Sequence, residues 1–261
     1  MPAKSSRGPW LWPLLLTAFG IVLLLNNFLL LGDFNATSLW PLALVILGAV
    51  ILLRGDLLAG GDGRTFGITR GSVESATLEI SAGEVDVQMR ALQQEGRLIA
   101  GQYALSARPV MRVSDTHTHL VMNRAATPWY SLSSWEMGLA RDLPWQVFVS
   151  TSLGQVNLDL ADVITSEAII ATGIGDIRII APHEALGNLQ ITSTLGNIHL
   201  ITPLGYYCRI QVKQGRFMGI HADENRYTQS EPNIFTSLDA AENAPLVEIS
   251  VTGTFGDLYL T

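Results

Sequence analysis

The stretch that decides the fold occurs three times in succession, as VSTSLGQVNL (149–158), IATGIGDIRI (170–179) and ITSTLGNIHL (191–200). Each copy has an apolar residue five positions before its glycine, and two more at two and four positions after it. Apolar side chains that alternate on both sides of a glycine are typical of two β-strands that meet at a turn. Each copy therefore predicts a strand pair with one apolar face.

The same pattern recurs around six glycines: Gly83, Gly154, Gly175, Gly196, Gly215 and Gly256. The middle glycines are 21, 21 and 19 residues apart, and the last interval, 41, is close to two periods. Because one such unit cannot bury its own apolar face, the copies must stack. The sequence thus predicts a mainly β domain, a right-handed, single-stranded β-solenoid with rungs of roughly 20 residues.

The repeat register predicts which apolar side chains form buried columns. One column contains Val85, Val156, Ile177, Ile198, Phe217 and Leu258, and a second contains Val87, Leu158, Ile179, Leu200, Gly219 and Leu260. The glycines are expected to adopt a positive φ where the chain turns.

Two apolar runs precede the repeats and predict a transmembrane helical hairpin over residues 10–58. Pro13 to Leu31 would span about 28 Å as a helix, whereas Leu39 to Leu53 would span only about 22 Å and relies on a thinned bilayer or on Arg54 snorkelling. A cleaved signal peptide is disfavoured, because the first run is too long and no A-x-A site follows it. Lys4, Arg7 and Arg54 lie outside the runs, so both termini are expected in the cytoplasm.

The predicted organisation has four parts. Residues 1–9 form a cytoplasmic N-terminus, 10–58 the hairpin, 59–72 a glycine-rich flexible linker and 73–261 the solenoid. Two segments interrupt the repeats. An aromatic insertion at 124–145 is expected to cover an end or flank of the solenoid, or else to line a ligand groove. A polar insertion at 222–245 reads as a long surface loop with one short strand at Ile234–Phe235.

The hairpin resembles the transmembrane region of LiaI/LiaF-type bacterial cell-envelope stress proteins. The similar residues are Asn26 to Leu30, then Leu39-Trp40-Pro41 and the following apolar residues to Gly48, ending in Leu52-Leu53-Arg54. The repeats resemble the β-solenoid, or toast-rack, domain found after such hairpins and in adhesins. The resemblance implies a membrane-bound regulatory protein that acts on a sensor kinase, although members of that family can have more membrane spans.

Composition and motifs argue against nucleic-acid binding, a metal site and enzymatic activity. A net charge of −7 disfavours nucleic acid, and the single cysteine, Cys208, excludes an intrachain disulfide and reads as a small buried residue. Asp115, His117 and His119 would share one strand face and are potential zinc ligands, but no fourth ligand is nearby, so a solvated face is expected. No nucleophile elbow or phosphate loop is present. We therefore predict no enzyme activity, catalytic site, metal or cofactor.

The expected function is a non-enzymatic regulatory or sensory accessory protein of the bacterial cell membrane. It would act through contacts with a membrane protein partner such as a sensor kinase. The alternative is a structural or adhesin-like module that self-associates through its ends. The final strand, Thr254–Thr261, has no sequence after it and is predicted to be an uncovered edge that pairs with a partner or a second copy.

Overall fold

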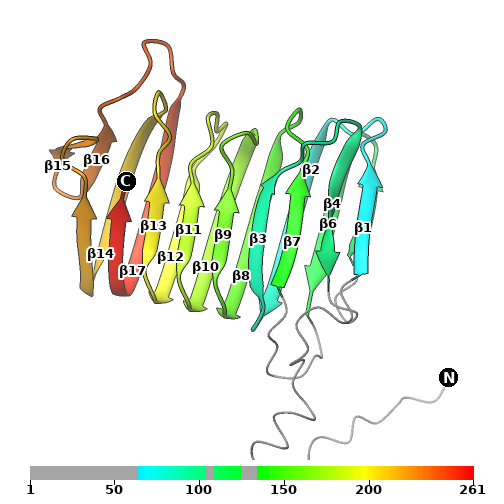
Figure 1. Cartoon of the computed structure of the whole chain (residues 1–261), viewed down its shortest axis with the longest axis horizontal. Helices are drawn as coiled ribbons and strands as arrows, with labels where there is room; N and C mark the ends of the chain where they lie inside the picture. The colour runs from blue at the N-terminus through cyan, green and yellow to red at the C-terminus, as the bar shows by residue number, and fades with distance from the viewer. Residues whose placement is uncertain (1–63, 104–108, 125–133) are drawn as a thin grey trace, which may run out of the picture. The chain divides into compact units, whose positions relative to one another are not determined.

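A computed structural model describes residues 64–103, 109–124 and 134–261. All the helices and strands that could be assigned in these ranges are β-strands, and no helix is present among them (Figure 1). The strands are β1 (Arg64–Thr69), β2 (Ser75–Gly83), β3 (Asp86–Ala91), β4 (Arg97–Tyr103), β5 (Val110–Ser114), β6 (His117–Asn123), β7 (Ser134–Leu139), β8 (Trp145–Leu153), β9 (Val156–Asp159), β10 (Thr165–Ile174), β11 (Ile177–Ile180), β12 (Leu189–Leu195), β13 (Ile198–Ile201), β14 (Tyr207–Ala222), β15 (Tyr227–Glu231), β16 (Ile234–Ser237) and β17 (Leu246–Leu260). The mainly β prediction is confirmed.

The strands form two layers that meet along a line of glycines. The first layer runs β5-β6-β2-β8-β10-β12-β17-β14-β16-β15, and the second runs β1-β4-β7-β3-β9-β11-β13-β17-β14. The second layer faces the viewer in Figure 1. The long strands β14 and β17 belong to both layers because they pass through the turn. The inner strands pair in parallel, whereas β1, β4, β5, β15 and β16 pair antiparallel at the two ends.

The predicted buried columns are present in the middle rungs. Ile177 pairs in register with Val156 on one side and Ile198 on the other, and all three side chains are at most 1% exposed. Leu158, Ile179 and Leu200 form the second column and are fully buried. The core is built mainly from such in-register columns between the layers. The repeat architecture is therefore confirmed, while the handedness of winding stays a prediction.

The copies around Gly83 and Gly215 are displaced by two or three residues from the predicted register. Val87, not Val85, pairs with Val156. At the other end Ile220, not Phe217, pairs with Leu258. A slip of two residues keeps the same side chains facing inward, so Val85 is still buried. A slip of three reverses the side, and Phe217 is exposed.

Neither the first nor the last repeat copy lies at an end of the stack. Strands β2 and β3 lie between β6–β7 and β8–β9, and β17 lies between β12–β13 and β14. The prediction that Thr254–Thr261 forms an uncovered edge is therefore wrong, because β17 is paired on both sides. Repeat spacing along the chain does not encode this order in space.

Both insertions contribute strands, and the short strand predicted at Ile234–Phe235 is confirmed as part of β16. Residues 134–139 and 145–153 are β7 and β8, and the side chains of Trp135, Met137 and Trp145 point into the core. In the 222–245 segment, β16 continues the first layer beyond β14, and buried Tyr227 and Phe235 cover the end of the core. The polar composition of this segment did not indicate a cap, because only two aromatic side chains are needed to cover the end of the core. Trp129 and Tyr130 lie outside the described residues.

The first strand lies within the segment predicted to be a linker. β1 (Arg64–Thr69) pairs antiparallel with β4, so the described domain begins at Arg64 rather than at Val73. The predicted hairpin, 10–58, lies outside the described residues. Within the described ranges, the structure contains no helix that is long and apolar enough to cross a lipid bilayer.

Candidate functional site

A row of large apolar side chains is exposed along the line where the layers meet. One residue comes from each of five neighbouring rungs, directly before the glycine in four of them. The residues are Leu153, Ile174, Leu195, Phe255 and Phe217, they are paired in register, and they are 42–59% exposed. At ~4.8 Å per rung, the row is about 19 Å long. We call this row the apolar ridge.

The ridge reverses the usual distribution of polar and apolar side chains. The residues two positions before Leu153, Ile174 and Leu195 point inward, and these are the hydroxyl residues Thr151, Thr172 and Ser193, all at most 6% exposed. The Thr151 hydroxyl donates to Thr172 Oγ1 over 3.0 Å, which partly satisfies this buried polar row. Exposed apolar groups in one contiguous row are a common property of interaction surfaces.

Close packing of the glycines holds the ridge residues in register. Gly175 and Gly196 both have φ of +144°, and a Cβ on either would lie less than 3.0 Å from the carbonyl oxygen of the glycine in the preceding rung. The Gly175 amide donates to Leu195 O, and the Gly154 amide donates to Ile174 O, each over 2.9 Å. The glycines therefore let adjacent rungs approach closely at the turn and present one apolar residue per rung.

Carboxylates and amides flank the ridge on its second-layer side. Asp86 Oδ1 accepts a hydrogen bond from the backbone N–H of Gln155 over 2.7 Å, and Asp176 Oδ1 accepts one from the backbone N–H of Asn197 over 2.8 Å. Asn197 Oδ1 in turn accepts from the Asp257 amide over 3.0 Å. These side-chain bonds tie successive rungs together and leave a line of negative charge beside the ridge.

At the end of the stack that β14 forms, the ridge consists of aromatic side chains. The rings of Phe217 and Phe255 are stacked, with centroids 4.9 Å apart and planes 5° from parallel. The Arg216 guanidinium lies 5.7 Å from the Phe217 ring centroid. This end also has an open strand edge, because no described strand pairs with the outer side of Gly219–Ala222. The open edge is therefore on β14, not on the final strand.

Asp115, His117 and His119, the residues considered for a metal site, do not form a metal-binding group. Asp115 lies in the β5–β6 turn with φ of +52°, not on the strand. The His117 ring nitrogens lie 2.8 Å from Ser75 Oγ and 3.0 Å from Thr77 Oγ1, while His119 Nε2 lies 3.4 Å from Glu79 Oε2. In the described ranges, no three His, Cys, Asp or Glu side chains form a metal-binding group.

Cys208 is buried, as predicted. Burial raises the pKa of its thiol to about 11, and a hydrogen bond with Thr202 opposes this shift. A thiol that stays protonated near neutral pH is a poor nucleophile. Burial also raises the pKa of nearby Tyr227, whose hydroxyl donates to Thr261 O over 3.2 Å. These groups serve packing at the capped end.

Sequence reasoning missed the ridge, although a signal for it exists. Leu153, Ile174, Leu195 and Phe255 each directly precede a repeat glycine. This recurrence is the signal, but alternation with the apolar residue four positions earlier predicts that each of them points inward.

No protein-family model matches this sequence, and no curated protein matches it. Among solved structures, a "putative cell adhesion protein" from Clostridium sporogenes is similar with a TM-score of 0.66 and 14% identity, over 76% of this chain and 98% of its own. A "putative adhesin" from Bacteroides fragilis matches with a TM-score of 0.33 and 8% identity, over 79% of this chain and 99% of its own. The first similarity shows that the two chains share a fold.

Proposed function

We propose that this chain is a membrane-anchored, non-enzymatic accessory protein of the bacterial cell envelope that binds a protein partner through the apolar ridge. The single observation that carries the proposal is the ridge itself, five in-register apolar side chains that are exposed, while in three of the rungs small hydroxyl residues take the inward positions. A sequence that only had to fold would place these residues the other way round.

The charge beside the ridge favours a protein over a lipid surface as its partner. Asp86, Asp176 and Asp257 lie along its flank, and an anionic leaflet would repel them. An amphipathic segment with an apolar strip and flanking Lys or Arg complements the ridge in both polarity and charge. In the regulatory reading, this segment belongs to a membrane protein such as a sensor kinase, the hairpin spans the membrane, and both termini and the β domain lie in the cytoplasm.

In-cell photo-crosslinking tests this proposal. A photoreactive phenylalanine placed at Ile174 or Leu195 in the full-length chain should give one discrete crosslinked partner. The matched control is the same residue at Arg178, which points outward in the same rung away from the ridge. Equal crosslinking from Arg178 would contradict a ridge-specific partner. A reporter fused after Thr261 should be active as a cytoplasmic fusion, and periplasmic activity would move the adhesin reading to first place.

A second candidate function is a self-associating, adhesin-like module, and one observation favours it. The second layer ends at β14, where the outer backbone groups of Gly219–Ala222 pair with no described strand. Such an edge can accept a strand from another chain. Sedimentation velocity of the full-length protein in detergent separates the two: a concentration-dependent oligomer abolished by Ile220→Pro would support self-association, and a monomer at all concentrations would favour the regulatory reading.

A further inference from the structure

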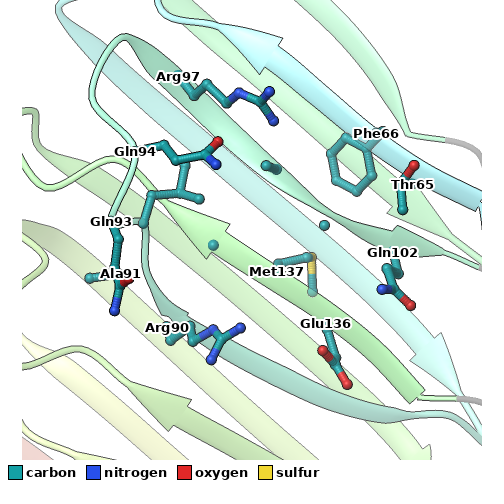
Figure 2. Close-up of a pocket in the computed structure, with 14 residues that line it drawn as sticks. Thr65, Phe66, Arg90, Ala91, Gln93, Gln94, Arg97, Gln102, Glu136 and Met137 are labelled. Atoms are coloured by element: carbon teal, nitrogen blue, oxygen red, sulfur yellow. The ribbon is translucent and has the colours of Figure 1, made fainter.

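A pocket lies at the opposite end of the second layer from the stacked phenylalanines, and Figure 2 shows the residues that line it. Its volume is about 430 Å³, and strands β1, β3, β4 and β7 and the turn after β3 line it. None of the residues that line this pocket belongs to the apolar ridge.

The floor of the pocket is low because three small residues occupy neighbouring outward positions. Gly67 pairs with Ala100, Ala100 pairs with Gly138, and Gly138 pairs with Arg90. A Cβ on Gly138 would lie 2.5 Å from Leu92 Cδ2, so the Leu92 side chain leans over this row and forms a wall. The result is a trough across the strands.

An arginine lies at each end of the trough. The Arg97 guanidinium passes over Gly67, because a Cβ there would lie 3.0 Å from Arg97 Nη1. Figure 2 shows Arg97 and Arg90 on opposite sides of the pocket. Within the described part of the chain, neither arginine forms a salt bridge, although Arg70, Arg124, Arg141 and Arg226 all do. Two guanidinium groups at one pocket without carboxylate partners are suited to bind carboxylates of a ligand.

The remaining lining groups indicate what else the ligand carries. Gln93, Gln94 and Gln102 offer both donors and acceptors, and Glu136 accepts hydrogen bonds at the rim. Phe66 adds apolar surface. Peptide N–H and C=O groups match side-chain amides, and a purely anionic small molecule would meet the charge of Glu136.

We propose that this trough binds an extended acidic peptide segment, with carboxylates paired to Arg90 and Arg97 and main-chain groups paired to the glutamines and Glu136. The row from Gly67 to Arg90 crosses three strand intervals, about 14 Å, which corresponds to roughly four extended residues. Two acidic side chains within a span of about four residues therefore fit the trough. This site is separate from the ridge, and its proposal does not rest on the proposed function.

Fluorescence anisotropy with the full-length protein in detergent micelles tests the inference. The probe is a fluorescein-labelled peptide with the sequence TETVTET, compared with its neutral analogue TQTVTQT and with free glutarate as competitor. Because one charge-assisted pair is lost in each case, we expect Arg97→Gln and Arg90→Gln each to weaken binding about tenfold. Arg209→Gln, an exposed arginine on β14, is the matched control and should leave the affinity unchanged.

Three results would overturn the proposal. The first is equal affinity for the neutral peptide, which would exclude recognition of carboxylates. The second is an equal loss in Arg209→Gln, which would indicate a general charge effect. The third is glutarate that binds as tightly as the peptide, which would identify a small-anion site instead. Circular dichroism spectra unchanged between variants would confirm that the substitutions act on binding and not on folding.

Discussion

Replacing Gly175 by alanine tests the packing that holds the rungs together at the turn. Gly175 has φ of +144°, and its added Cβ would lie less than 3.0 Å from the carbonyl carbon and oxygen of Gly154. The strained backbone conformation costs about 1–3 kcal/mol for a residue with a side chain. Relieving the contact would stretch at least one backbone hydrogen bond across the turn, worth about 1 kcal/mol. We therefore expect a loss of about 2–4 kcal/mol in the free energy of unfolding.

The assay is urea unfolding of the full-length protein in micelles, followed by the fluorescence of the buried Trp135 and Trp145. The matched control is Gly71→Ala. Gly71 also has a positive φ, +56°, but no heavy atom lies within 4 Å of its added Cβ. That change should cost about 1–2 kcal/mol, from the backbone conformation alone. If both substitutions cost the same, close approach of the rungs is not what requires glycine at position 175.

Three further predictions concern the core, the thiol and the ridge. Ile177→Asp should destabilise the domain by about 3–5 kcal/mol, because it buries an unpaired charge, while Arg178→Ala on the outward side should cost under about 0.5 kcal/mol in the same urea assay. The pKa of the Cys208 thiol is about 11 in the folded protein and about 8.5 in the unfolded chain. The unfolded state therefore loses its proton first, and the free energy of unfolding should fall as pH rises between these values. Cys208→Val should flatten that slope. Ile174→Asn should abolish partner crosslinking yet change the urea midpoint little, since its side chain is half exposed; a large drop in stability would make the ridge a folding element instead.

Local pattern predicted the buried columns but not the exact register at the ends. Around Ile177 three successive copies agree on every position, so the alternation identifies each inward side chain. A displacement of two residues, as at Val87, leaves the same face inward, and the sequence pattern cannot detect it. Trp135 was assigned to an insertion because the chain around it lacks a turn glycine, although it occupies a core position.

The candidate sites depend on contacts that sequence spacing does not show. The trough exists because β4 and β7 bring Ala100 and Gly138 side by side from distant parts of the chain. The ridge was visible only as an apolar residue before each glycine, and burial rules predict that such a residue points inward. Both surfaces therefore needed strand pairing in space before their residues could be recognised as neighbours.

The position of β17 between β13 and β14 has a consequence for synthesis on the ribosome. Strand β14 emerges before β17, and its permanent neighbour does not yet exist when β13 is already complete. In the nascent chain, β14 must either stay unpaired with β13 until β17 is made or form a temporary β13–β14 pairing that β17 later displaces. By the same logic, a stop codon before Leu246 would remove an internal rung rather than a dispensable tail. Truncation before Leu246 should therefore be as damaging as a deletion in the middle of the β domain.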